Sequence, residues 1–263
     1  MTQIRFYGEG LAGFSRTNPL PGRLIVLEGT DGVGRSTQIA LLREWVESLG
    51  YAVQSTGMKR SALAGKGIKE AMRGHTLGLL TTNLFYATDM VDRLEKVILP
   101  ALRAGFVVLT DRYIYSIIAR AMVRGVDPAW IRDVFGFALV PDLVLYLHAD
   151  LPHLIPRVLN ARGFDYWESG MDFLPHRDYY DAFVEYQSRL LAQFDAMPET
   201  YNFCRIDATR SIREVFQDLK TQIEQILVDM KPVAPAIAEM ELAEAKAESK
   251  AGAWVEGNRQ SPG

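Results

Sequence analysis

The stretch that decides the fold is residues 24–37, which read LIVLEGTDGVGRST. Its first four residues are all large and aliphatic, as in a strand that is buried on both faces of a parallel sheet. Three glycines follow within six residues, and Ser36 and Thr37 then open a helical pattern that stops at Gly50. The apolar face of this helix is expected to consist of Ile39, Leu42, Val46 and Leu49. Strand, glycine-rich turn and helix in this order predict the first unit of an α/β sheet.

Four more short runs rich in branched and aromatic residues predict the remaining strands. They lie at 51–55, 106–109, 143–147 and 202–206, and helical patterns separate them. Parallel strands joined by right-handed helical crossovers are the simplest structure for this alternation. We therefore expect an α/β fold, a doubly wound five-stranded parallel sheet with helices on both faces. Ligands of such sheets bind beyond the carboxyl ends of the strands.

Residues 29–37 match the P-loop motif GxxxxGK[ST] at every position except the lysine, which is Arg35. In a P-loop the glycines allow a tight backbone path, successive N–H groups surround phosphate oxygens, and the dipole of the following helix favours negative charge. The alternative, a glycine-rich turn that binds no ligand, fits this spacing less well. The residues expected to bind ATP here are Gly29, Gly32, Val33, Gly34, Arg35, Ser36 and Thr37.

An acidic residue and an arginine follow the third predicted strand. Asp111 can face a metal ion across the sheet from the P-loop, and Arg112 can grip a phosphate through two parallel hydrogen bonds. Ser36 would add a hydroxyl oxygen, so Ser36 and Asp111 together predict a Mg²⁺ site. An Asp at a strand end is more often a helix cap or a turn residue, and the P-loop upstream is what favours the metal-binding interpretation.

Residues 162–172, RGFDYWESGMD, form a polar and aromatic loop after a helical pattern. Such a loop could be a lid that closes over a site and excludes water during phosphoryl transfer. An ordinary surface loop fits the same residues almost equally well.

The composition narrows the class of protein. The formal net charge of -3 over 263 residues argues against binding to a nucleic acid polymer. No apolar run reaches the roughly 18 to 20 residues that span a bilayer, and the first ten residues lack the pattern of a secretory signal. The single cysteine, Cys204, excludes a disulfide framework. We expect a cytoplasmic protein that does not enter a membrane.

The chain divides into three parts by composition. Residues 1–21 carry Gly, Ser, Asn and two prolines and are expected to be a poorly packed N-terminal extension. Residues 22–230 hold all the predicted strands and form the expected domain. Residues 231–263 are rich in alanine and charge and poor in large apolar groups, so we expect a disordered tail of low complexity.

From Leu24 to about Val228, the order of motifs resembles the thymidylate kinase family of nucleoside monophosphate kinases. The motifs that carry the resemblance are LIVLEGTDGVGRSTQ (24–38), LFYATDMVDRLEKVILPALRAG (84–105), DRYIYS (111–116), PDLVLYL (141–147) and RIDATRSIREV (205–215). The resemblance implies transfer of the γ-phosphoryl group of ATP to a nucleoside monophosphate, with dTMP as the default acceptor and Mg²⁺ as the metal. It also implies a homodimer, to which the helix at 84–102 could contribute.

The resemblance assigns roles to individual residues. Asp31 would lie near the 3'-hydroxyl of the acceptor sugar, and Arg60 and Arg112 would hold the acceptor phosphate. Arg162 of the lid would meet the donor phosphates, and Tyr86 would stack on the acceptor base. The donor adenine would lie against Asp207, Ala208 and Thr209. The residues expected to act in catalysis are Arg35, Asp31, Arg112 and Arg162.

The sequence departs from the family pattern at the expected site. Arg35 replaces the lysine that reaches the donor phosphates, and an arginine differs from a lysine in shape, hydration and reach. Met90 stands where the family has an arginine at the thymine edge, and Arg120 where it has an aromatic residue or a glutamine. Lys59 stands where a glutamate often precedes the phosphate arginine, and Tyr166 replaces the second lid arginine.

We therefore expect Met90 and Arg120 to join Asp31, Arg60, Tyr86 and Arg112 in an altered acceptor pocket. Because the sequence departs from the family pattern at these positions, two alternatives to a dTMP kinase stay open. The first is a kinase for another pyrimidine monophosphate, and the second is a nucleotide-binding regulatory protein that has lost most phosphoryl transfer.

Overall fold

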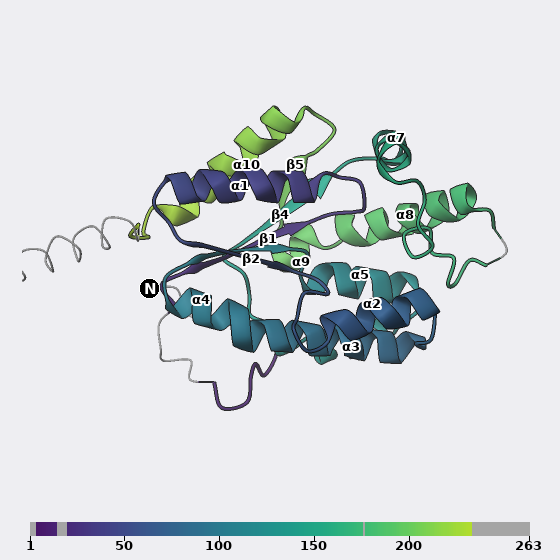
Figure 1. The fold of residues 1–263 in the computed structure, drawn as a ribbon, viewed down its shortest axis with the longest axis horizontal. Helices are drawn as coiled ribbons and strands as arrows, with labels where there is room; N and C mark the ends of the chain where they lie inside the picture. The colour runs from purple at the N-terminus through teal and green to yellow at the C-terminus, as the bar shows by residue number, and fades with distance from the viewer. Residues whose placement is uncertain (1–3, 15–19, 176, 233–263) are drawn as a thin grey trace, which may run out of the picture.

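The computed structural model describes residues 4–14, 20–175 and 177–232 of the chain. In this part the strands form one parallel sheet in the order β2-β3-β1-β4-β5 (Figure 1). The predicted doubly wound sheet is confirmed. Each end of each strand lies within two residues of its expected position. The strands are β1 (Arg23–Glu28), β2 (Val53–Gly57), β3 (Val107–Asp111), β4 (Leu143–His148) and β5 (Cys204–Asp207).

Helices cover both faces of the sheet (Figure 1). One face packs against α1 (Arg35–Ser48), α7 (Leu151–Ala161) and α10 (Ile212–Leu227). The other face carries α3 (Leu79–Arg93), η1 (Leu94–Ile98), α4 (Leu99–Arg103), α5 (Ile114–Val123), α6 (Pro128–Val134) and α8 (Tyr179–Asp195). The two short helices α2 (Gly65–Gly74) and α9 (Pro198–Tyr201) complete the described part. None of the described helices is both long enough and apolar enough to cross a bilayer.

The uninterrupted apolar run of β1 serves two separate cores. Successive side chains of a strand point to opposite faces, so Leu24 and Val26 lie in the core under α3, α5 and α8. Ile25 and Leu27 lie in the other core, under α1 and α10. All four side chains are completely buried. The polar residues of β1, Arg23 and Glu28, therefore stand only at its two ends.

The helix expected at 84–102 is present as a continuous run from α3 through η1 to α4. Its middle is a π-helical turn just before Pro100, which has no N–H to offer to the preceding turn. The expected apolar face of α1 is correct for Ile39, Leu42 and Val46 but wrong for Leu49. The helix ends at Ser48, and Leu49 turns outward with 44% of its surface exposed because Gly50 reverses the chain at a positive φ of 86°.

Residues 4–14, the described stretch of the expected N-terminal extension, are better packed than the sequence predicts. Ile4 is buried in the core, and Phe6 forms an isolated antiparallel bridge with Leu139. The hydroxyl of Tyr7 contacts the hydroxyl of Tyr115 on α5. Ile4, Phe6 and Tyr7 therefore pack against the domain, although residues 1–21 are rich in the glycines and prolines typical of loops. The expected disordered tail at 231–263 falls outside the described residues, apart from residues 231 and 232.

Because Ile4 is part of the core, the substitution Ile4→Ala should lower the free energy of unfolding by about 2 kcal/mol. Val228→Ala is the matched control, because the Val228 side chain is 79% exposed and its loss should change stability by less than about 0.5 kcal/mol. Urea denaturation followed by circular dichroism measures both. Equal midpoints for the two variants would show that the N-terminal segment adds nothing to the fold.

Candidate active site

The P-loop lies between β1 and the first turn of α1. Gly29 has a φ of 142°, and a Cβ at this position would lie 2.4 Å from the carbonyl oxygen of Leu147, so only glycine fits. Gly34 precedes the helix in a left-handed conformation with φ of 97°. Ser36 and Thr37 are exposed at this helix N-terminus, whereas the side chain of Val33 is buried in the core. The loop therefore presents backbone N–H groups and a helix dipole, which together form an anion-binding site.

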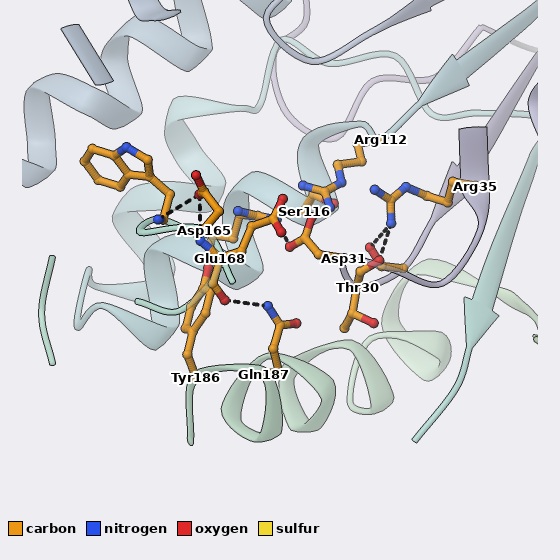
Figure 2. A network of polar contacts seen from close by, with 12 residues as sticks. Thr30, Asp31, Arg35, Arg112, Ser116, Asp165, Glu168, Tyr186 and Gln187 are labelled. Carbon is orange, nitrogen blue, oxygen red and sulfur yellow. Dashed lines mark hydrogen bonds and ion pairs between the residues drawn. The ribbon is translucent and has the colours of Figure 1, made fainter. Parts of the chain in front are cut away.

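Arg35 is folded back onto the loop that carries it. Its guanidinium donates hydrogen bonds to the carbonyl oxygen of Gly29 at 2.6 Å and to that of Thr30 (Figure 2). Its Nε lies 2.9 Å from Oδ1 of Asp111. The side chain is only 10% exposed. In this conformation Arg35 neutralises the Asp111 carboxylate and donates hydrogen bonds to two carbonyl oxygens of its own loop.

Ser36 and Asp111, the predicted metal ligands, are brought together. The Ser36 hydroxyl donates to Oδ2 of Asp111 across 3.5 Å. Burial alone would raise the pKa of Asp111, but the neighbouring cations Arg35 and Arg112 outweigh burial and lower it. Asp111 is therefore an anion at neutral pH, with hydroxyl and carboxylate oxygens of the kind that Mg²⁺ prefers. Within the described residues, no group of three or more His, Cys, Asp or Glu side chains offers another metal site.

Asp31 lies between two arginines that approach it from α5 and the turn before it. Arg112 contacts Oδ1, as Figure 2 shows, and Arg120 donates to Oδ2 at 2.6 Å. All three side chains are at least four-fifths buried. Burial opposes ionisation of Asp31, but Arg112 and Arg120 hold its pKa well below the usual range. The carboxylate thus fixes both guanidinium groups at one end of a cavity.

A second buried carboxylate sets the backbone that carries Arg112. Glu28 accepts hydrogen bonds from the backbone N–H of Tyr113 at 2.8 Å and of Ser116 at 3.2 Å, and from the Ser116 hydroxyl. Burial raises the pKa of Glu28. Arg112 itself has a φ of 67°, a left-handed conformation that residues other than glycine seldom adopt. The Glu28 contacts stabilise this turn, which aims the arginine at Asp31.

A third buried carboxylate, Asp89 on α3, organises the segment after β2. It accepts hydrogen bonds from the backbone N–H groups of Lys59 at 3.1 Å and Ser61 at 2.9 Å, and from Nε of Arg93 at 2.9 Å. Arg60 lies between these two anchored residues and is exposed, and its charge contributes to the low pKa of Asp111. Asp89 therefore holds Lys59 and Arg60 at the carboxyl end of the sheet.

Two adjoining cavities lie beyond this end of the sheet. The first, called here the cationic cavity, has a volume of about 470 Å³ and is lined by Asp31, Lys59, Arg112, Arg120, Arg162 and Glu168, among others. The second, the aromatic cavity, has a volume of about 380 Å³ and is lined by Met72, Asn83, Tyr86, Ile117, Arg124 and Trp167, among others. Both share Arg120, His75 and Tyr166 as walls. Together they suit a molecule with an anionic end and a flat apolar end.

The predicted lid at 162–172 forms the outer wall of both cavities. The indole N–H of Trp167 donates to the carbonyl oxygen of Met72 at 3.1 Å, and the ring of His75 lies 4.1 Å from that of Tyr166 between centroids. Arg162 forms an ion pair with Glu168 and lines the cationic cavity. The lid arginine therefore faces the cationic cavity together with Asp31, and its side chain is 55% exposed.

Of two further predicted nucleotide contacts, Met90 lies in the core and residues 207–209 lie at the end of β5. Met90 is completely buried in the core, with its sulfur 3.3 Å from the Arg93 guanidinium, and it lines neither cavity. This disagrees with the expectation of a base contact, because Met90 shares a face of α3 with Tyr86 but lies one turn further along the helix, where it packs in the core against Arg93. Asp207 is the last residue of β5, and Ala208 and Thr209 follow it. Arg157 of α7 donates to the carbonyl oxygens of Ala208 at 2.7 Å and Thr209 at 3.2 Å.

The structure adds residues that the motifs did not reveal. Arg124 forms two hydrogen bonds with Asp172 and one with the Tyr186 hydroxyl, which connects α5, the lid and α8. It lies one helical turn after Arg120, so helical spacing from a predicted site residue could have found it. Arg157 and Trp167 had no comparable signal, because their roles depend on how α7 and the lid fold over the sheet.

Known proteins with similar sequences match most of this chain. Residues 27–219 match the family described as thymidylate kinase. A relative from Saccharolobus solfataricus named "Probable thymidylate kinase 2" is 37% identical over 201 residues, which covers 76% of this chain and 94% of the relative. A "Probable thymidylate kinase" from Thermococcus gammatolerans is 32% identical over 214 residues, which covers 78% of this chain and 97% of the relative.

Removal of the Asp89 carboxylate should destabilise the protein strongly. Asp89→Ala leaves the Arg93 guanidinium buried without its counter-ion, because both side chains are at most 1% exposed, and should lower the free energy of unfolding by about 3 to 5 kcal/mol. In the double variant Asp89→Ala/Arg93→Met, part of this loss should be recovered because no charge stays unpaired. Urea denaturation of wild type, both single variants and the double variant measures the coupling. Simple addition of the two single effects would contradict the assignment of Asp89 and Arg93 as one buried pair.

Proposed function

Because this chain belongs to the thymidylate kinase family, we propose that it transfers the γ-phosphoryl group of ATP to dTMP and forms dTDP and ADP. The observation that carries the proposal is the continuity of the two cavities next to the P-loop. In support, Asp31, Arg112 and Arg120 line the cationic cavity and suit a monophosphate and a sugar, and the aromatic cavity has the size and lining for a nucleobase. Family membership and this arrangement support the same reaction.

The donor nucleotide would bind along the P-loop. The backbone N–H groups of Gly32, Val33 and Gly34 would surround its phosphates, and the exposed hydroxyls of Ser36 and Thr37 lie at the same helix N-terminus. The carbonyl contacts of Arg157 give the loop at 207–209 a fixed shape at the end of β5, which supports its proposed role against adenine. The donor would therefore lie on the α1 side of the sheet end.

The acceptor would occupy the two cavities. Arg112 and Arg60 would hold the monophosphate, and Asp31 would face the sugar. In support of this role, Nε of Arg112 is buried and has no hydrogen-bond partner among the described residues, which leaves a donor for a phosphate oxygen. Tyr86 lines the aromatic cavity and would contact the base. The buried Met90 no longer belongs in this set.

The chemistry needs positioning and charge neutralisation more than proton transfer. A phosphate monoester oxygen is already anionic near neutral pH, so the acceptor needs no protein base. Ser36 and Asp111 would hold Mg²⁺, which when bound neutralises charge on the donor phosphates. Arg35 would stabilise the transferring group after it exchanges the carbonyls of Gly29 and Thr30 for phosphate oxygens. Arg162, at the wall of the cationic cavity, would reach the same group from the lid.

One observation favours a second candidate function. Arg35 satisfies its guanidinium within its own loop and pairs with the carboxylate proposed for the metal. If this conformation persists when ATP binds, the chain is a nucleotide-binding protein with little phosphoryl transfer, as the sequence departures also allow.

The two functions predict different effects of Arg35 substitutions. As a kinase, the wild-type protein should produce ADP from ATP and Mg²⁺ only when dTMP is added. Arg35→Ala should lower kcat by at least about 100-fold, because a cation that stabilises transition-state charge is lost. Coupled measurement of ADP, repeated with a panel of deoxy- and ribonucleoside monophosphates, identifies the acceptor.

Arg35→Lys serves as the comparison variant, because it restores the motif's usual residue. If wild type shows no turnover with any acceptor but binds ATP by calorimetry, and Arg35→Lys gains activity, the chain is a binding protein silenced at one position. A preference for another pyrimidine monophosphate would instead correct the acceptor.

We also propose that the chain forms a homodimer through α3. Four large apolar side chains near its start are exposed on the described chain: Leu79, Leu80, Leu84 and Phe85. Single exposed apolar residues are ordinary, whereas a group of four on one helix indicates a covered surface. The expected cytoplasmic location stays a prediction.

The dimer is tested by Leu84→Glu, which places a charge within this apolar group. Light scattering after size-exclusion chromatography should give twice the mass of one chain for wild type and one chain for the variant. Leu159→Glu is the control, because Leu159 is 50% exposed on α7, away from α3, and should leave the mass unchanged. A monomeric wild type would disprove the proposed homodimer.

A further inference from the structure

Lys59 points into the cationic cavity but has no role in the function described so far. It follows β2 with a φ of 61°, a left-handed conformation, and its backbone N–H is fixed by the Asp89 carboxylate. Its Nζ contacts the sulfur of Met72 at 3.8 Å, a weak acceptor. Among the residues that the structure describes, no carboxylate forms an ion pair with Lys59.

The charges around Lys59 do not balance. Asp31 is the common partner of Arg112 and Arg120, so three cations share one carboxylate when Lys59 is included. Glu168 forms its ion pair with Arg162, so this second carboxylate is already matched. Two positive charges are left over at this side of the cavity, and a phosphate monoester carries up to two negative charges at neutral pH. A half-buried cation without a counter-ion is less favourable than a hydrated one, and a ligand can supply that counter-ion.

We propose that Lys59 binds the phosphate of the acceptor nucleotide together with Arg112 and Arg120. This proposal rests on the proposed kinase function, because it assigns the acceptor to the cationic cavity. It adds a phosphate ligand at a position to which the family resemblance gives no such role. Arg112 and Arg120 each divide their charge between Asp31 and the ligand, whereas the Lys59 ammonium is available to the ligand alone.

The assignment has a consequence for the effect of pH. Burial and the nearby cations Arg120 and Arg112 lower the pKa of Lys59 to about 8, although Asp31 and Glu168 act in the opposite direction. The free protein therefore loses this charge as the pH rises above about 8, and affinity for a phosphate dianion falls with it. Below a pH of about 6 the phosphate itself takes up a proton. The other charged or titratable groups that line this cavity are Lys69, Arg73, His75, Arg162, Asp165 and Tyr166.

The experiment measures kcat and KM for dTMP between about pH 6 and pH 10 in wild type, Lys59→Met and Lys59→Arg. Lys59→Met should raise KM about 10- to 100-fold at pH 7, as expected for a lost charge-assisted hydrogen bond, and kcat/KM should lose its decline near pH 8. Lys59→Arg should keep a low KM and move the decline to higher pH, because arginine stays charged. Lys66→Met is the control, since the Lys66 side chain is 87% exposed on the outer side of α2.

Binding measurements separate this proposal from the proposed reaction. Calorimetry with dTMP and with thymidine, which lacks the phosphate, should show that Lys59→Met weakens only dTMP. Thermal unfolding of each variant shows whether the fold is intact, and the Lys59→Arg result excludes a loss caused by packing alone. Unchanged dTMP affinity and an unchanged pH profile in Lys59→Met would overturn the role of Lys59. A wild type that binds dTMP with this Lys59 dependence but makes no ADP would overturn the reaction and leave the phosphate site supported.

Discussion

The carboxylate of Glu28 connects the two halves of the site. It is completely buried at the end of β1, directly before the P-loop, and it accepts hydrogen bonds from Tyr113 and Ser116 at the start of α5. A buried carboxylate needs these donors, because an unsatisfied one would be strongly unfavourable. The start of α5 is therefore fixed relative to the P-loop. The positions of Arg112, just before this turn, and of Arg120, further along the helix, depend on these three hydrogen bonds.

Electrostatics explains why these residues gather without bound substrate. Each buried charge near the sheet end has a partner inside the protein or stands where a ligand can supply one. Asp31 holds Arg112 and Arg120, and Asp111 holds Arg35. Buried cations lose hydration that they would keep at the surface. These ion pairs offset that loss and hold the arginines near the end of the sheet. A ligand that carries phosphate can then replace internal contacts with contacts of its own.

Local pattern was sufficient to predict the sheet, because each strand is an apolar run bounded by residues that favour turns. It was sufficient for the P-loop as well, since spacing and context coincide there. Local pattern failed at Leu49 and at residues 4–14, because burial of these residues depends on which distant part of the chain packs against them. It also failed at Met90, because one helix contains both cavity-facing and core-facing positions and their assignment depends on how α3 packs. Arg157 acts on a loop some fifty residues further along the chain, so no local motif contains it, whereas Arg124 could have been found by its helical spacing from Arg120.

The position of Trp167 allows its fluorescence to report on the two cavities. Its indole forms part of the wall of both cavities and donates its N–H to the Met72 carbonyl oxygen. The other two tryptophans in the described part of the chain, Trp45 and Trp130, line neither cavity. Indole fluorescence responds to the polarity of its surroundings and to the loss of a hydrogen bond. Movement of the lid away from α2 therefore changes the emission of Trp167, whereas Trp45 and Trp130 lie outside both cavities.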